Sequence, residues 1–274
     1  MTDAGEWQGR VGDIWAEQWK RTDRSFGKLT EELLGRIGRK PFNQVLDIGC
    51  GAGELSLAIG RAHRDCMVTG LDISGSLVAT ARERGSGLAN VQFFQADATD
   101  WRPGQDARPD LIVSRHGVMF FGEPEAAFSN LHAAAAAGGG LIFSCFRDRT
   151  ENPFFTEVAA LLPRPADVVD PRAPGPFAFA EPPYVGSTLE RAGWVDVKFD
   201  RFDFAMIAGA GDDPVGEALA YWSAIGPAAA AMRGMSRTEQ EAFATALRAL
   251  AQDNCRDGIV ALRAAAWIVS ARAG

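Results

Sequence analysis

The chain has 274 residues, of which 47% are hydrophobic and 23% charged, a composition typical of a folded protein with a sizeable core. Its formal net charge is −7 and it has no block of lysine or arginine, which argues against nucleic acid as a partner. The four cysteines are scattered, without a histidine at ligand spacing, so neither a metal site nor a disulfide framework is expected.

The beginning of the chain is polar and carries no apolar segment of the kind found in secretory signals. Further along, no apolar run approaches the length needed to cross a membrane. We therefore expect a cytoplasmic protein with reduced thiols and no membrane partner.

Residues 1–40 show apolar side chains at helical spacing and are predicted to form a helical N-terminal cap. From residue 41 to 274 we expect one α/β domain. Its strands are predicted at 44–48, 66–72, 91–95, 111–114 and 141–146, and its helices at 54–62, 75–84 and 124–136. This alternation indicates a parallel sheet covered on both faces.

The second half of the chain departs from this alternation. Residues 152–183 are rich in proline and phenylalanine and are predicted to be a long loop or lid. A helix at 185–192 and strands at 195–207 and 259–272 complete the predicted sheet. Between these strands, about 208–257, lies a mostly helical insertion that we expect to form a cap, a homodimer face, or both.

The sharpest motif is a glycine loop that joins the first strand to the first helix of the domain. Such glycines let the backbone turn tightly and approach a ligand. A dinucleotide site would show G-x-G-x-x-G, but here the spacing is G-x-G-x-G, and Glu54 would oppose a pyrophosphate at the helix start. Asp47, just before the glycines, suits an ammonium or sulfonium ligand. The motif reads Val45-Leu46-Asp47-Ile48-Gly49-Cys50-Gly51-Ala52-Gly53.

This segment resembles the S-adenosylmethionine-binding motif D-x-G-x-G-x-G of class I methyltransferases, and further landmarks of that family follow in order. Asp72 ends the second strand, where the family binds the ribose hydroxyls, and Asp97 follows the third, near the adenine amino group. The segment from Asp110 to His116 resembles the family's fourth strand and its loop. Glycines 138–140 resemble the family's turn before strand five, and the resemblance covers roughly residues 43–146.

The resemblance implies a Rossmann-like sheet of seven strands, mostly parallel with the last antiparallel. It implies S-adenosylmethionine as cofactor, S-adenosylhomocysteine as product, and methyl transfer to O, N or C of a small apolar or aromatic metabolite. Catalysis would rest mainly on proximity and orientation. The implied cofactor-binding residues are Asp47, Gly49, Gly51, Gly53, Asp72, Ile73, Asp97, Ala98, Ser114 and Trp19. Within the family, residues 114–121 and 174–179 resemble a bacterial branch related to the enzymes of ubiquinone and menaquinone biosynthesis.

His116 is the candidate general base, because it follows the fourth strand at the edge of the sheet where ligands bind, and its ordinary pKa suits proton transfer. The alternative is a histidine that only packs or hydrogen-bonds. Arg115 is predicted either to orient an anionic substrate or to pair with a local acid. Predicted substrate contacts, for which plain packing is the alternative, are Trp15, Phe120, Phe177, Phe179 and Tyr184.

Two other functions remain open from the residues alone. One is a nicotinamide-dependent oxidoreductase on the same scaffold, against which Glu54 and Asp47 argue. The other is a protein that binds S-adenosylmethionine without catalysis, since the motifs are evidence for cofactor binding and the fold does not specify an acceptor.

Overall fold

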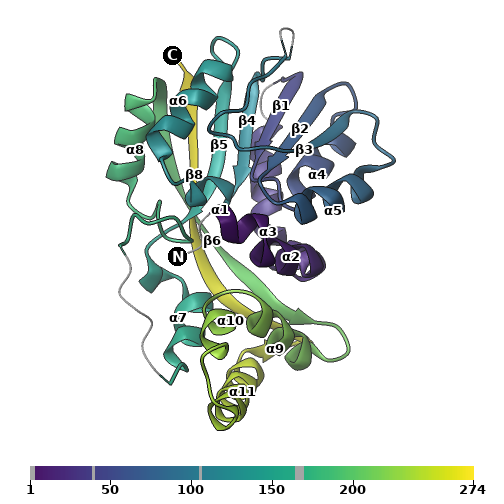
Figure 1. The fold of residues 1–274 in the computed structure, drawn as a ribbon, viewed down its shortest axis with the longest axis vertical. Coiled ribbons are helices and arrows are strands. Elements are labelled where there is room, and N and C mark those ends of the chain that lie inside the picture. Colours follow the sequence, from purple (N-terminus) through teal and green to yellow (C-terminus); the bar gives the residue numbers. More distant parts are fainter. Residues whose placement is uncertain (1–3, 39–40, 105–106, 164–169) are drawn as a thin grey trace.

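The computed structural model describes residues 4–38, 41–104, 107–163 and 170–274, and these form one mixed sheet flanked by helices (Figure 1). The strand order is β3-β2-β1-β4-β5-β8-β6. All neighbours are parallel except β8, which runs antiparallel to β5 and β6. The predicted Rossmann-like sheet is thus confirmed. The strands are β1 Gln44–Ile48, β2 Met67–Asp72, β3 Val91–Gln95, β4 Leu111–Arg115, β5 Gly140–Phe146, β6 Trp194–Ala210, β7 Cys255–Arg256 and β8 Ile259–Ala273.

The prediction of seven strands was short by one. β7 has two residues and pairs only with β8. The two strands are joined by Asp257 and Gly258, which both have positive φ, 50° and 74°. An Asp-Gly pair with this backbone forms the tight turn of a β-hairpin with a two-residue loop. This turn brings Cys255 and Arg256 alongside the start of β8, where they pair as β7.

The helices of the sheet lie on both faces. Strand order runs one way from β1 through β2 to β3 and the other way through β4 to β5, so right-handed crossovers place α4 and α5 on one face and α6 on the other. α6 also packs against α8, and α8 packs against β6. No helix in the described ranges is long and apolar enough to cross a membrane. The bounds are α4 Glu54–Ala62, α5 Gly75–Gly85, α6 Pro124–Ala134 and α8 Pro182–Arg191.

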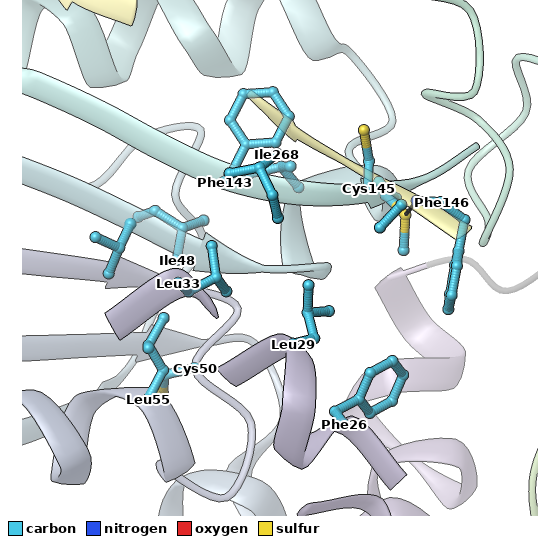
Figure 2. Close-up of a cluster of buried hydrophobic side chains, with 14 of the residues drawn as sticks. Phe26, Leu29, Leu33, Ile48, Cys50, Leu55, Phe143, Cys145, Phe146 and Ile268 are labelled. Atoms are coloured by element: carbon cyan, nitrogen blue, oxygen red, sulfur yellow. Dashed lines mark hydrogen bonds between the residues drawn. The ribbon is translucent and has the colours of Figure 1, made fainter. Parts of the chain in front are cut away.

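Within the described part of residues 1–40 there are three helices: α1 Ala4–Gln8, α2 Arg10–Glu17 and α3 Trp19–Ile37. Phe26, Leu29 and Leu33 lie at helical spacing on the buried face of α3. They meet the side chains of β1 and β5 in the cluster shown in Figure 2. α3 is therefore part of the core and not only a cover.

Strands β6 and β8 continue past the rest of the sheet, and their far ends carry the insertion between them (Figure 1). It consists of α9 Pro214–Ala224, α10 Pro227–Met232 and α11 Arg237–Asp253, a helical region as predicted. The predicted loop at 152–183 was partly wrong, because it contains α7, Pro153–Ala160. Proline is well tolerated at the first helical position, and Phe154 and Val158, four residues apart, are both buried. Residues 164–169 of that loop lie outside the described ranges.

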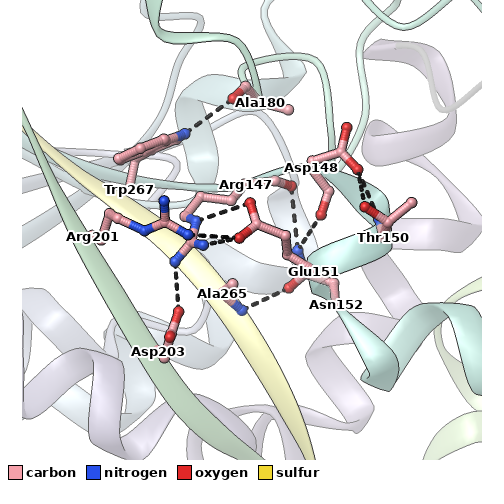
Figure 3. A network of polar contacts seen from close by, with 10 residues as sticks. All are labelled: Arg147, Asp148, Thr150, Glu151, Asn152, Ala180, Arg201, Asp203, Ala265 and Trp267. Carbon is pink, nitrogen blue, oxygen red and sulfur yellow. Dashed lines mark hydrogen bonds and ion pairs between the residues drawn. The ribbon is translucent and has the colours of Figure 1, made fainter.

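A buried polar network fixes the turn after β5 against β6 and β8 (Figure 3). Nδ2 of Asn152 donates to the carbonyls of Arg147 and Asp148, and its Oδ1 accepts from the amide of Ala265 at 2.8 Å. The buried Arg147 guanidinium pairs with Glu151 and with Asp203 of β6. Since α7 begins directly after Asn152, this network also sets the direction in which α7 leaves the sheet.

We expect Asn152→Ala to lower the free energy of unfolding by about 2–4 kcal/mol, because two carbonyls and one amide lose their partner in a buried place. Urea unfolding with an unchanged m-value measures this. Arg191→Ala is the matched control: its ion pair with Glu125 is half exposed, so its loss should cost no more than about 0.5 kcal/mol. Equal effects in the two variants would contradict the structural role of Asn152.

Candidate active site

A single continuous cavity of about 280 Å³ opens at the carboxyl ends of β1, β2 and β4. One end is lined by the glycine loop and by carboxylates. The other end is lined by aromatic and apolar side chains from α3, β5, α7 and α9. Ligands of open α/β sheets bind at this edge, so we take the cavity as the candidate active site.

The floor of the cavity is a close contact between the loops after β1 and β4. Gly49 has a φ of 61°, and a Cβ added there would lie 2.7 Å from Cα of Gly117, so only glycine fits. The Ser114 hydroxyl donates to the Ile48 carbonyl at 2.7 Å and accepts from the Gly117 amide at 3.1 Å. The two loops are therefore held as one unit.

Two predicted cofactor residues support the cavity without lining it. The Ser114 hydroxyl makes its hydrogen bonds to the two loops, as described above. Gly53, with a φ of 88°, faces away from the cavity, where an added Cβ would lie 2.8 Å from the Phe93 ring. A side chain there would also meet Ala81 of α5, so a glycine lets the loop pack closely on β3 and α5, and its predicted contact with the cofactor stays a prediction.

The acidic residues Asp72 and Asp97, predicted to bind the cofactor, both line the cavity. Asp72 accepts from the amide of Gly51 through Oδ2 and from the amide of Ser74 through Oδ1, each at 2.9 Å. Burial raises the pKa of Asp72, while these amides lower it. Asp97 accepts from the amide of Thr99 at 2.8 Å. The predicted residues on the cavity wall are Asp47, Gly49, Gly51, Asp72, Ile73, Asp97, Ala98 and Trp19.

Asp47 is fully buried at the end of β1. The Ser56 hydroxyl donates to its Oδ2 at 2.6 Å. Burial raises the pKa of Asp47 to about 7, and the Ser56 hydrogen bond and the charge of Arg115 oppose this rise. At neutral pH the carboxyl is thus close to its midpoint, and a cation placed beside it would draw it into the charged form.

A second, partly buried acid, Asp23 of α3, lies between two arginines. Its carboxylate is 2.7 Å from Arg84 and 3.4 Å from Arg115. Burial raises the pKa of Asp23 to about 6, although both arginines lower it. The structure therefore gives Arg115 the second of its two predicted roles, pairing with a local acid, and Arg115 also donates to Thr30 at 2.9 Å.

The sequence interpretation missed Asp23. An acid in a charged amphipathic helix reads as part of the solvated face. A signal was present, however, because Asp23 precedes the buried Phe26 by three residues and so lies on the same helix face. An acid on the apolar face of a helix needs a partner, and here it has two.

The N-terminal helices cover the carboxylate end of the cavity. Trp7, Trp15 and Trp19 all line it, and the Trp7 ring lies 5.5 Å from that of Trp15 and 5.0 Å from that of Phe120. The Arg84 guanidinium stacks 3.8 Å from the centre of the Trp19 ring. Of the predicted contacts, Trp15, Trp19 and Phe120 thus lie at the cavity, and Trp7 is an addition.

Three predicted substrate contacts lie elsewhere. Phe179 is 1% exposed and packs with Phe128 and Phe143 on the α6 face of the sheet, and Tyr184 contacts Phe179 there. Phe177 packs behind the cavity wall, against Phe146 and Phe155. The reason is α7, which brings its own aromatic residues to the cavity and displaces the later part of the segment. The apolar end is lined by Phe26, Phe146, Phe154, Phe155, Met206, Tyr221 and Trp222.

His116 lies between the two ends of the cavity. Its ring is 4.2 Å from that of Phe146 and 5.2 Å from that of Phe26, and its Nδ1 is 3.1 Å from the Ser144 hydroxyl. Burial lowers the pKa of His116 to about 3, so the ring is neutral. Its backbone φ of 66° turns the chain into the short helical turn that follows.

The described residues show no candidate metal site. Among residues 4–38, 41–104, 107–163 and 170–274 no three histidine, cysteine, aspartate or glutamate side chains could together hold an ion.

Several known proteins are similar to this chain. A trans-aconitate 2-methyltransferase of Paracidovorax citrulli is 32% identical over 147 residues, which are 53% of this chain and 55% of that protein. The chain spans about half the length of the curated relatives it matches. A phosphoethanolamine N-methyltransferase 2 structure of Haemonchus contortus has a TM-score of 0.56 at 16% identity, over 97% of this chain and 60% of that one.

A Bacillus halodurans protein described as a 'putative methyltransferase' has a TM-score of 0.53 at 17% identity, over 89% of this chain and 97% of that one, and it shares the fold. The narrower resemblance to ubiquinone and menaquinone enzymes is not tested by these matches and stays a prediction. The family model described as a methyltransferase domain matches residues 45–139, the segment that holds the glycine loop and the acidic landmarks. Residues 45–139 of the chain thus match a methyltransferase domain, and the relatives named above are methyltransferases.

Proposed function

We propose that the protein is an enzyme that transfers a methyl group from S-adenosylmethionine to a small, largely apolar acceptor. The observation that carries this proposal is the continuity of the cavity: the family's cofactor residues and an apolar chamber of aromatic side chains open into one another. Sites for small molecules generally combine apolar walls with a few placed polar groups. A protein that only bound the cofactor would have no use for the second chamber.

The residues present fit the cofactor. The Asp72 carboxylate is oriented by two backbone amides and suits a pair of ribose hydroxyls, and Asp97 with the backbone at Ala98 suits the adenine edge. Asp47 and Asp23 suit the ammonium group of the methionine end, and Arg115 suits its carboxylate. The tryptophans of α1–α3 would cover the bound molecule.

The bound cofactor supplies a methyl carbon on a sulfonium sulfur; the acceptor atom bonds to that carbon, and the sulfur keeps the electron pair of the broken bond. The protein's own contribution is to bring the two reactants together and to exclude water. The close contact between Gly49 and Gly117 gives the cavity a rigid floor that holds the reactants in place. The apolar side chains of the cavity exclude water.

The proposal includes the nature of the partners. A net charge of −7 supports a small-molecule acceptor over a nucleic acid. We propose a cytoplasmic location and retain the helical insertion α9–α11 as the candidate homodimer face. The acceptors named for the relatives, trans-aconitate and phosphoethanolamine, belong to those proteins.

Asp72→Ala is expected to weaken binding of S-adenosylhomocysteine at least tenfold, because the ribose hydroxyls lose a charged acceptor and the Gly51 amide loses its anchor. Isothermal titration calorimetry measures the dissociation constant. Asp100→Ala, an exposed acid that does not line the cavity, should leave it unchanged. An unchanged constant in Asp72→Ala would remove the cofactor assignment.

Binding of S-adenosylmethionine should tighten as pH rises. Asp47 has a pKa near 7 and Asp23 one near 6, so at pH 6 most Asp47 carboxyls are protonated and must lose that proton to pair with a cation. We expect the dissociation constant to fall roughly five- to tenfold between pH 6 and pH 7.5. In Asp47→Asn most of this dependence should vanish, leaving the smaller part due to Asp23. A wild-type constant that is equal at both pH values would contradict the placement of a cation beside these acids.

A further inference from the structure

Four residues of the cavity wall carry a buried polar atom that has no hydrogen-bond partner among the described residues: Trp7 Nε1, Thr22 Oγ1, His116 Nε2 and Trp222 Nε1. His116 and Trp222 border the apolar end and are only 7% and 2% exposed. Leaving a buried donor or acceptor unpaired costs free energy, and buried polar side chains in folded proteins are nearly always paired. A ligand in the apolar end that reached these two atoms would remove that cost.

The two atoms differ in what they can bind. Nδ1 of His116 lies 3.1 Å from the Ser144 hydroxyl, which can donate or accept, so Nε2 can present either a lone pair or a hydrogen. The indole Nε1 of Trp222 can only donate. A hydroxyl group suits both atoms, because it can accept from Trp222 and donate to Nε2 of His116 when the ring hydrogen is on Nδ1.

The charges of the cavity exclude an anionic acceptor. Among the described residues that line it, Arg115 is the one lysine or arginine; it is paired with Asp23 and Thr30, and in the proposed function its remaining capacity is taken by the carboxylate of the cofactor. Four carboxylates line the same cavity: Asp23, Asp47, Asp72 and Asp97. An acceptor carboxylate or phosphate would enter an apolar chamber with no free cation and with negative charge beyond it, at a high desolvation cost.

The walls favour a flat molecule. The rings of Phe26 and Phe146 flank His116 at 5.2 Å and 4.2 Å, and Phe155 meets Phe146 edge-on at 4.9 Å. Aromatic rings gain from stacked and edge-to-face contacts with another ring, beyond the burial of area.

We propose that the acceptor is an uncharged aromatic or conjugated ring that carries a hydroxyl group, and that this hydroxyl donates to Nε2 of His116 and is the group methylated. The proposal rests on the proposed function and narrows it to O-methylation of a neutral molecule.

The hydroxyl oxygen bonds to the methyl carbon, the carbon–sulfur bond breaks and its electron pair stays on sulfur. Burial lowers the pKa of His116 to about 3, so the ring is unprotonated at working pH but is a weak base. The hydroxyl proton therefore passes to Nε2 of His116 only as the oxygen gains positive charge on bonding to carbon, and the ring releases it to water once the product leaves. The positive charge that leaves the sulfur reappears on the imidazole, so the total charge of the cavity does not change in the transfer.

The test uses the full chain saturated with S-adenosylhomocysteine and four matched probes: 2-naphthol, 2-methoxynaphthalene, naphthalene and 2-naphthoate. Tryptophan fluorescence or calorimetry gives each dissociation constant. We expect 2-naphthol to bind at least tenfold more tightly than 2-naphthoate at pH 7.5, with naphthalene weaker than 2-methoxynaphthalene. With S-adenosylmethionine in place of the product, 2-naphthol should yield its methyl ether.

Two variants separate the two polar contacts. In His116→Asn the new residue tolerates the positive φ but lacks the ring nitrogen. We expect this variant to bind 2-naphthol about five- to tenfold more weakly and the other probes as before. Trp222→Phe keeps an aromatic ring but removes the N–H donor, so binding of 2-naphthol and 2-methoxynaphthalene should weaken while binding of naphthalene should not. His63→Phe, outside the cavity, is the control and should change none of them.

Tighter binding of 2-naphthoate than of 2-naphthol, or no effect of His116→Asn on 2-naphthol, would overturn the proposal. So would a protein that binds S-adenosylhomocysteine but none of the neutral probes; in that case the proposed methyltransferase function would still stand. Failure to bind S-adenosylhomocysteine at all would instead overturn the proposed function.

Discussion

The contact between the backbones at Gly49 and Gly117 is the constraint on which the active site depends. It brings the loops after two neighbouring strands, β1 and β4, closer than any side chain would allow, and the Ser114 hydroxyl ties them together. One loop carries the glycines that would face the cofactor, and the other carries His116. Under the proposed function, the relative position of cofactor and acceptor would thus be set by main-chain atoms, which are less free to move than side chains.

Helix α3 supplies the second part of the site and shows how a core element becomes functional. Its apolar face joins the sheet through Phe26, Leu29 and Leu33, and the same face places Asp23 between Arg84 and Arg115. Glu54 also pairs with Arg84, so these two acids and two arginines are paired inside the protein before any ligand enters. Because they are paired, the cavity is acidic at one end and without available charge at the other, and this asymmetry would separate a cationic cofactor from the neutral acceptor that we propose.

The sequence predicted the half of the site that depends on local order along the chain. Asp47, Asp72 and Asp97 each end or follow a strand, and parallel strands bring such residues to one edge. It failed where the contact is made between distant segments. Phe179 and Tyr184 looked like a substrate wall, but α7 takes that place, and Tyr221 and Trp222 of the insertion complete it. No periodicity within residues 213–254 distinguishes a residue facing a ligand from one facing a core, and the two-residue strand β7 is specified only by its turn.

The long pair β6 and β8 carries α9 beyond the edge of the sheet, so the wall that holds Trp222 is built on an arm of the fold. The glycine loop and its acids belong to another region, residues 45–97, and share no element with that arm. Glu217 of the same helix α9 is ion-paired with Arg21 and Arg24 of α3, the helix that places Asp23 and Trp19 at the other end of the cavity. Under the proposed function, a substitution on the cavity side of α9 would therefore alter the acceptor pocket directly, whereas one that moved the whole helix would be felt at the cofactor end as well.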